Sequence, residues 1–174
     1  MAGVMLAWGK KLTGEERRLV RVMCARLGVE PDFMMAAMAF ETGETFSPSV
    51  RNPVSSATGL IQFMASTAKA LGTSVEALAG MTFAEQLVWV EKYFTPWKGR
   101  LVSLEDVYMA ILWPAAVGKP LDYVLFAKAD SKRRRAYLAN AGLDVNYDGK
   151  ITKAEAAGKV RAKLVKGRRL EWAG

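Results

Sequence analysis

Two stretches of the chain decide its fold: Phe40-Glu41-Thr42-Gly43-Glu44-Thr45-Phe46-Ser47-Pro48 and, after a short polar segment, Ala57-Thr58-Gly59-Leu60-Ile61-Gln62-Phe63. Ahead of the first stretch, Pro31 suits the first turn of a helix. Met34, Ala37, Met38 and Glu41 then recur at spacings of three and four. This spacing predicts a helix that carries Glu41 on its apolar face.

The chemistry of Glu41 follows from that position. A carboxylate that points at an apolar wall is difficult to ionise, so its pKa rises and it can donate a proton near neutral pH. Cleavage of a glycosidic bond needs such an acid on the leaving oxygen. The alternative is a glutamate at a helix end that reaches into water.

The two stretches resemble the catalytic segment of soluble lytic transglycosylases and goose-type lysozymes, which cut the sugar strands of bacterial peptidoglycan. In that family a glutamate closes an apolar helix, a loop with an aromatic residue and a proline follows, and a Gly-Leu-x-Gln element forms the floor of the sugar cleft. The resemblance makes Glu41 the catalytic residue and implies that Phe46, Gly59 and Gln62 contact substrate. The loop before Phe46 is longer than the commonest family spacing, and Thr42 replaces the usual Ser.

A second catalytic group is left open. A retaining glycosidase needs a nucleophilic carboxylate about 5 Å from the acid, and an inverting one needs a base further away. Glu44 is the nearest candidate, facing either the cleft or water. In the transglycosylases that the chain resembles, the substrate's own 6-hydroxyl attacks, a 1,6-anhydro product forms, and one glutamate acts as acid and then as base. The sequence fits that mechanism, with a hydrolysing muramidase as the alternative outcome.

A third family element is altered here. Transglycosylases often carry an Ala-Tyr-Asn-Ala-Gly-like stretch in a later helix, whose polar side chains contact the sugar. The comparable region runs from Tyr108 to Gly118 and contains Trp113-Pro114-Ala115-Ala116-Val117 but no Asn. The family tyrosine is therefore either shifted to Tyr108 or replaced by Trp113, and we expect both to be substrate-binding candidates. Trp113 is equally compatible with a place in the core.

A metal-binding motif occupies residues 144–155, which read Asp-Val-Asn-Tyr-Asp-Gly-Lys-Ile-Thr-Lys-Ala-Glu. The segment matches D-x-[DN]-x-[DN]-G-x5-E, the calcium loop of an EF-hand, at every fixed position. Ca²⁺ prefers six to eight oxygen ligands. The expected ligands are the side chains of Asp144, Asn146, Asp148 and Glu155, the carbonyl of Lys150, and Thr152 directly or through water. We expect a structural ion rather than a catalytic one; the alternative is a turn that binds no metal.

The composition indicates one domain with an appendage. Hydrophobic residues make up 51% of the 174, enough for a core, and the single Cys24 follows a helical apolar pattern. The absence of His excludes a Cys–His nucleophile pair and argues against a zinc site. Capping signals at Thr13, Thr82 and Ser103 and glycines at 28, 72 and 118 predict helix ends. We predict a mostly α, lysozyme-like domain of seven or eight helices over residues 1–127. A basic segment, 128–174, packs on it and holds the EF-hand-like helix-loop-helix.

The two parts of the chain differ in net charge. Residues 1–127 carry 12 basic and 12 acidic side chains, and residues 128–174 carry 13 and 5, so the second part holds the whole net charge of +8. The charge is either a solvated surface or an attraction to anionic cell-envelope polymers. No nucleic-acid-reading motif accompanies it. The expected partner is the peptidoglycan glycan strand, bound by a monomer.

The N-terminal residues 1–8 are apolar but too short for a signal peptide or a membrane span. We therefore expect either a phage endolysin that leaves the host cytoplasm through membrane holes and then reaches the periplasm and cell wall, or a virion-associated lysin. The alternative of another class is an inactive, calcium-dependent wall-binding or structural virion module.

Overall fold

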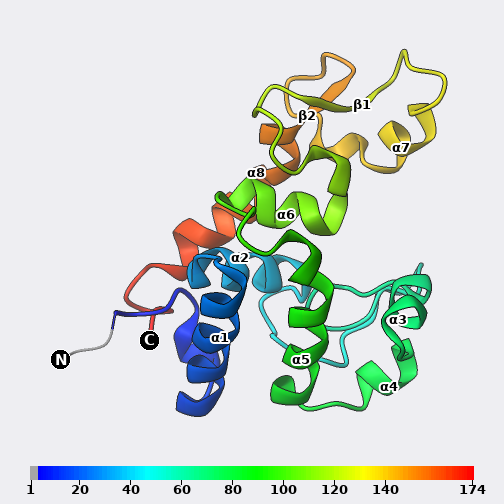
Figure 1. The fold of residues 1–174 in the computed structure, drawn as a ribbon. Helices are drawn as coiled ribbons and strands as arrows, with labels where there is room; N and C mark the ends of the chain where they lie inside the picture. Colours follow the sequence, from blue (N-terminus) through cyan, green and yellow to red (C-terminus); the bar gives the residue numbers. More distant parts are fainter. Residues whose placement is uncertain (1–3) are drawn as a thin grey trace.

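The computed structural model describes residues 4–174 and is mostly α-helical (Figure 1). In this part of the chain eight α-helices accompany one antiparallel sheet of two strands, which confirms the mostly α class. The first three residues of the apolar N-terminal segment lie outside the described part. Within residues 4–174, every helix falls short of the length and apolar character that crossing a bilayer requires.

The elements follow one another with short connections. The helices are α1 (Gly14–Leu27), α2 (Pro31–Glu41), α3 (Ala65–Leu71), α4 (Val75–Ala79), α5 (Phe83–Phe94), α6 (Leu104–Leu112), α7 (Arg134–Ala139) and α8 (Lys153–Gly167). The strands are β1 (Val124–Ala127) and β2 (Lys150–Thr152). Single 3₁₀ turns occur at η1 (Gly9–Lys11), η2 (Thr95–Trp97), η3 (Pro114–Ala116) and η4 (Ala141–Leu143).

Helix ends follow local chemistry at most of the predicted positions. Thr13 and Thr82 each form a complete capping box at the start of α1 and α5, and Ser103 accepts a backbone hydrogen bond at the start of α6. Gly28 and Gly72 end α1 and α3 in the left-handed conformation. The prediction for Gly118 was wrong, because α6 already ends at Leu112, before a proline and a 3₁₀ turn.

Helix α2 lies at the centre of the molecule. Six consecutive residues, 34–39, are fully buried, so the helix has no solvent-facing side along this stretch. Helices α1, α6 and α8 pack against it, and Figure 1 shows it enclosed among them. Cys24 of α1 is fully buried in the same core, as the helical pattern predicts. Each large apolar side chain buried here contributes about 1.5–3 kcal/mol.

The C-terminal helix returns to the beginning of the chain. Helix α8 lies along α2 and α6, and the residues after it reach the N-terminal segment. The backbone of Leu6 donates to Gly174 and accepts from it in return, at 2.8 and 3.1 Å. The indole Nε1 of Trp8 donates to the carbonyl of Lys163 at 2.9 Å. Residues 128–174 therefore share one hydrophobic core with the earlier part of the chain.

The small sheet joins the two parts as well. Strand β1 pairs with β2 in an antiparallel register that places Phe126 opposite Ile151, and both side chains are buried. Ile151 lies within the segment 144–155, so the strand pairing joins that segment to the end of the earlier part of the chain.

Ion pairs explain part of the uneven charge distribution. Five of them connect basic side chains of residues 153–168 with acidic side chains of residues 1–127. The pairs are Lys153–Asp106, Arg161–Glu105, Lys163–Glu44, Lys166–Glu44 and Arg168–Asp32. Much of the positive charge on α8 thus pairs with acidic side chains of the same protein, and these pairs attach the helix to the core.

The Lys153–Asp106 pair should be the most costly of these to break. Both side chains are almost fully buried, and Lys153 Nζ lies 2.5 Å from Asp106 Oδ1. Lys153→Met leaves a buried carboxylate without a counter-charge, so we expect the free energy of unfolding in urea to fall by about 3–5 kcal/mol.

Two variants serve as controls for this prediction. Adding Asp106→Asn should recover part of the lost stability, since the unpaired charge is gone. Arg18→Met, which breaks the exposed Arg18–Glu15 pair, should unfold like the wild type. Equal losses in Lys153→Met and Arg18→Met would contradict the assignment of a buried, energetically important pair.

Candidate functional site

Glu41 is the last residue of α2, and its side chain is half-buried at the end of the apolar helix. Burial raises its pKa from 4.5 to about 7. Within residues 4–174 the carboxylate forms no hydrogen bond or ion pair with another side chain, so nothing offsets the cost of ionising it. The carboxyl group is therefore protonated in a large fraction of molecules at neutral pH.

Two tyrosines lie near this carboxyl group. Burial first, and then the negative charge of Glu41, raises the pKa of Tyr93 to about 12 and raises that of Tyr108 as well. The Tyr93 hydroxyl donates to the carbonyl of Ala110 at 2.5 Å, which ties α5 to α6. The ring of Tyr108 meets Phe40 edge-on, with centroids 5.6 Å apart. Tyr93 of α5 and Tyr108 of α6 thus form aromatic surroundings for Glu41.

The Gly59–Gln62 element is a tight turn. Gly59 has a φ of 82°, and a Cβ at this position would lie 2.3 Å from Gln86 Oε1, so only glycine fits. Gln62 also has a left-handed backbone, with φ 54°. Its side-chain amide donates to the carbonyls of Gly59 and Val50, at 3.0 and 3.3 Å. Gly59 and Gln62 therefore stabilise the conformation of the turn itself.

Gln86 of α5, which the sequence analysis missed, fixes this turn to the rest of the protein. Its side chain is fully buried and accepts from the backbone N–H of Leu60 at 2.7 Å. Its amide nitrogen donates to the carbonyls of Pro48 and Leu78, at 2.9 and 2.8 Å. One side chain therefore connects the loop after Glu41, the Gly-Leu-Ile-Gln turn and α4. Its only signal in the sequence is an uncharged polar residue beside an apolar helical face.

A small cavity of about 50 Å³ brings the turn and the tyrosine together. Its lining comes from the turn, the start of α3, α5 and α6, and consists of Ile61, Gln62, Phe63, Met64, Thr67, Tyr93 and Ile111. Tyr93 is close enough to Glu41 to respond to its charge. Tyr93 thus lies near both the turn and Glu41. Tyr93 is a site residue that the sequence analysis missed.

Phe46 and Glu44 lie on the side of the loop that faces the C-terminal helix. Phe46 is almost fully buried and packs against Trp8, with ring centroids 6.2 Å apart. The carboxylate of Glu44 contacts the ammonium groups of Lys163 and Lys166. Burial alone would raise the pKa of Glu44, but the hydrogen bonds and charges of these two lysines outweigh it and hold the pKa below its usual value.

Trp113 lies beside the sheet, on the other side of α6. Its ring meets Phe126 of β1 edge-on, with centroids 4.9 Å apart, and the guanidinium of Arg133 lies 6.0 Å from it. Its indole Nε1 is buried and has no hydrogen-bond partner within residues 4–174. The structure thus brings Glu41, Tyr108 and the Gly59–Gln62 turn toward Tyr93, and gives Trp113 different neighbours.

The loop at 144–155 is ordered by its own side chains. Asp144 is buried and accepts from the Tyr137 hydroxyl at 2.7 Å and from the backbone of Gly149 at 2.9 Å. Burial alone would raise the pKa of Asp144, but these hydrogen bonds hold it low. Asn146 and Asp148 accept backbone hydrogen bonds within the loop, at 3.0 and 2.8 Å.

Glu155 ends the loop and begins α8. Its Oε2 accepts from the backbone and hydroxyl of Thr152, forming a capping box, whereas its Oε1 is buried without a hydrogen-bond partner in the described residues. Across residues 4–174, His, Cys, Asp and Glu side chains form no group of three or more able to hold a metal ion. A cation here would need amide, carbonyl or water oxygens besides carboxylates. The donor chemistry and the unpartnered oxygen fit a hard cation.

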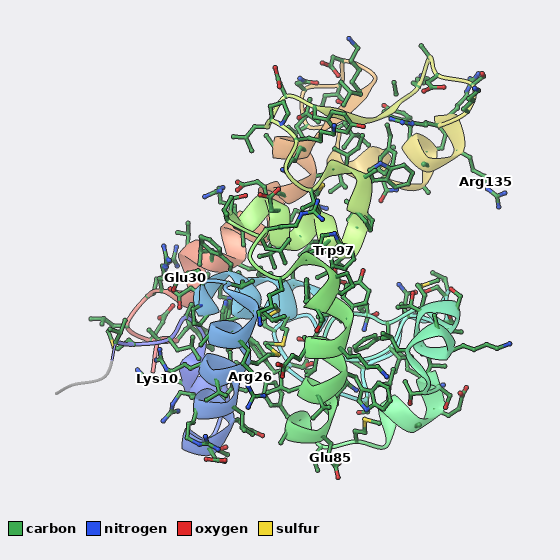
Figure 2. The ribbon with its side chains drawn as sticks, viewed as in Figure 1. Lys10, Arg26, Glu30, Glu85, Trp97 and Arg135 are labelled. Carbon is green, nitrogen blue, oxygen red and sulfur yellow. The ribbon has the colours of Figure 1, made fainter. Side chains whose placement is uncertain are left out.

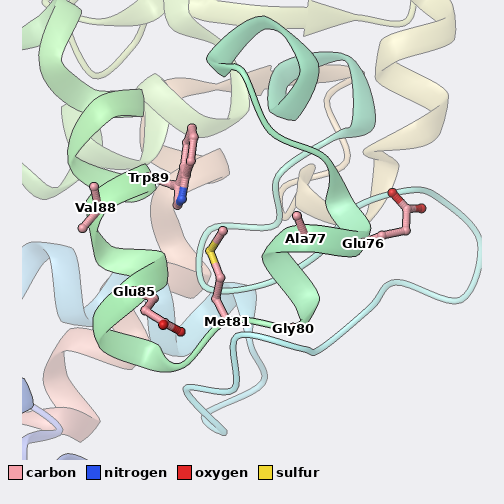
Figure 3. A pocket seen from close by; sticks show the side chains of 7 residues that line it. All are labelled: Glu76, Ala77, Gly80, Met81, Glu85, Val88 and Trp89. Atoms are coloured by element: carbon pink, nitrogen blue, oxygen red, sulfur yellow. The ribbon is translucent and has the colours of Figure 1, made fainter.

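A larger cavity lies elsewhere, between α4 and α5, and measures about 520 Å³ (Figure 3). Its lining consists of Glu76, Ala77, Gly80, Met81, Glu85, Val88 and Trp89. None of the predicted site residues belongs to it. We place the candidate site at Glu41, where the perturbed carboxyl group lies.

No protein-family model matches the chain, and no curated protein matches it either. A function must therefore be inferred from the geometry of the site and from the sequence motifs.

The raised pKa of Glu41 has a consequence for stability that does not depend on any activity. Since folding raises the pKa from 4.5 to about 7, the unfolded chain loses this proton at a lower pH than the folded protein does. The contribution of Glu41 is therefore fully present below pH 4.5 and is lost as the pH rises to about 7. At about 1.4 kcal/mol per pKa unit, the loss reaches about 3 kcal/mol.

Glu41→Gln carries no titrating proton, so its stability advantage over the wild type should grow across this window. Urea unfolding of both proteins at about pH 4, 6 and 8 measures it. A difference that stays constant with pH would mean that Glu41 ionises as freely in the folded protein as in the unfolded chain.

Proposed function

We propose that this protein is a peptidoglycan-degrading glycosidase that cleaves the β-1,4 bond between N-acetylmuramic acid and N-acetylglucosamine. Glu41 is its general acid and base. The observation that supports this most directly is the half-buried carboxyl group at the end of α2, whose pKa of about 7 suits proton donation near neutral pH. The resemblance of the flanking stretches to lytic transglycosylases and goose-type lysozymes supplies the substrate class.

The proposal uses one catalytic carboxylate. Glu44, the nearest alternative, contacts two lysines, which favours a mechanism without a carboxylate nucleophile. The leaving oxygen takes the proton of Glu41, and the resulting carboxylate then accepts a proton from the attacking hydroxyl. In the transglycosylase reaction this is the 6-hydroxyl of the substrate, and in the alternative, a hydrolysing lysozyme, it is water.

Glu41→Gln should abolish lysis of permeabilised Gram-negative cells. The substitution keeps the size of the side chain and removes the transferable proton, so we expect a loss of at least about a hundredfold. A turbidity assay beside the wild type measures it, and circular dichroism checks that the variant is folded. Retention of more than about a tenth of the activity is incompatible with this role for Glu41.

The products of the same digestion separate the competing functions. Mass spectrometry of the muropeptides should find 1,6-anhydro ends if the enzyme is a transglycosylase and reducing ends if it is a lysozyme. A folded wild type that binds peptidoglycan without cleaving it would instead support the wall-binding or structural virion module.

We also propose that the loop 144–155 binds Ca²⁺ in a structural role. The side chains of Asp144, Asn146, Asp148 and Glu155 would hold the ion together with the carbonyl of Lys150 and with Thr152. The unpartnered Oε1 of Glu155 supports this, since a bound cation would satisfy a buried oxygen that lacks a donor. When bound, the ion supplies charge neutralisation to the acidic side chains of the loop.

Calcium should raise the melting temperature of the wild type. Binding to the folded state alone stabilises it by about 2.7 kcal/mol when free Ca²⁺ is a hundred times the dissociation constant. Melting curves in EDTA and in millimolar Ca²⁺ measure the shift, which should be absent in Glu155→Gln combined with Asp144→Ala.

Glu155→Gln alone is the matched control for this experiment. It removes a carboxylate from the proposed ion site, but its amide oxygen can still cap α8 through Thr152. An unchanged shift in the double variant would place the ion elsewhere, and no shift in the wild type would reduce the motif to an ordinary turn. Lytic activity at low temperature should survive EDTA at least in part, since Glu41 belongs to another element.

The remaining basic side chains are available to an anionic partner. In residues 128–174, those that form no ion pair are Lys128, Lys132, Arg133, Arg134, Arg135, Lys150, Lys159 and Arg169. Figure 2 shows Arg135 projecting from α7, away from the body of the molecule. We propose that the six of these side chains within residues 128–150 attract the enzyme to anionic envelope polymers after it leaves the host cytoplasm, or when the virion meets the cell.

A further inference from the structure

We propose that Glu44 is a positioning residue: Lys163 and Lys166 of α8 bind its carboxylate and thereby hold the loop 42–48 in the conformation that keeps Glu41 at its apolar wall. The proposal rests on the function proposed for Glu41. It gives Glu44 a role other than that of a second catalytic carboxylate.

The contacts are direct and use both oxygens of the carboxylate. Glu44 Oε1 lies 2.5 Å from Lys163 Nζ and 2.9 Å from Lys166 Nζ, and Oε2 lies 2.7 Å from Lys166 Nζ. The two lysines are three residues apart, on one face of α8. The glutamate is only 20% exposed and the lysines are 28% and 36% exposed, so water screens these pairs less than it screens pairs on the open surface.

Lys166 is itself held in place by aromatic rings. Its ammonium lies 5.4 Å from the ring centroid of Trp8 and 5.1 Å from that of Trp172. The two rings pack on each other, with centroids 5.2 Å apart. Trp8 also packs on Phe46 and donates to the carbonyl of Lys163. The same cluster therefore fixes the cations that bind Glu44 and the aromatic side chain at the end of the loop.

The loop needs such an external hold, because its backbone conformation is unfavourable. Gly43, Glu44 and Phe46 have φ angles of 59°, 70° and 54°, and only the glycine adopts this region without strain. Residues with side chains persist there when surrounding contacts determine them. Thr42 provides one such contact, since its hydroxyl donates to Met38 at 2.7 Å and accepts from the backbone of Phe46 at 2.9 Å. The lysines of α8 provide another, through the side chain of Glu44.

The loop acts on Glu41 through the chain itself. Thr42 directly follows Glu41, and the backbone N–H of Glu44 donates to the carbonyl of Ala39, inside the last turn of α2, at 2.7 Å. A loop that relaxes to ordinary backbone angles would pull on that turn and on the direction of the Glu41 side chain. The ion pairs also neutralise the charge of Glu44 close to the acid.

The test combines amide hydrogen exchange of residues 42–48 with kcat and KM on soluble peptidoglycan strands. The variants are Glu44→Gln, Glu44→Lys, and Glu44→Lys combined with Lys163→Glu. The last keeps one acid among two lysines and leaves Lys166 on its aromatic rings. Glu15→Gln is the matched control, since it removes the same charge from the exposed pair with Arg18.

In Glu44→Gln we expect exchange at residues 44 and 46 to quicken by about tenfold or more, and kcat to fall by a similar factor with KM within about twofold. Glu44→Lys should be worse, the charge-swapped variant should recover most of both losses, and Glu15→Gln should match the wild type. Unchanged exchange in Glu44→Gln, or a swap no better than Glu44→Lys, would overturn the proposal.

Two further outcomes keep the proposals distinct. A loss of kcat in Glu44→Gln without faster exchange would overturn the positioning role and make Glu44 a catalytic carboxylate. A wild type that cleaves no glycan but shows the predicted exchange pattern would support the hold of α8 on the loop while refuting the glycosidase.

Discussion

Helix α2 imposes the constraint on which the rest of the structure depends. A helix buried along six consecutive residues must be covered on every side, and three other helices are needed to do so. At its last residue, where burial is partial, the chain places an ionisable group. The carboxyl group of Glu41 therefore inherits an apolar environment from the helix that carries it, and its raised pKa follows from that burial without any special partner.

Helix α8, one of the three helices that cover α2, explains the excess of basic residues after position 127. From the sequence alone this excess can be a solvated surface or a binding surface, and some of these side chains do lie on the surface. The structure shows that five of the ion pairs of this segment reach acidic side chains of the earlier part of the chain.

The predictable features were those encoded over short distances along the chain. Capping residues, helix-ending glycines and the apolar spacing before Glu41 each act within a few residues, and they place most helix ends and the carboxyl group. The surroundings of the site were not accessible in this way. Lys163 contacts Glu44 across 119 residues, and Gln86 reaches Leu60 across 26. No local pattern distinguishes these side chains from ordinary solvated ones, because their partners are chosen by the packing of whole helices. The burial of Phe46 against Trp8 could not be predicted for the same reason. The resemblance to known families instead implied that Phe46 contacts the sugar substrate.

The joining of the two ends of the chain has a consequence for how the protein is made. Leu6, Trp8 and Lys10 form backbone hydrogen bonds with Gly174, Gly167 and Trp172, and Lys163 and Lys166 reach the loop beside Glu41 from the same late segment. Contacts between such distant residues form slowly, because the intervening chain must first be ordered. During synthesis α2 leaves the ribosome long before α8 does, so the apolar residues 34–39 remain without one of their covers. The candidate site thus becomes complete only once α8 has been synthesised, and until then the growing chain exposes the surface that α8 will bury.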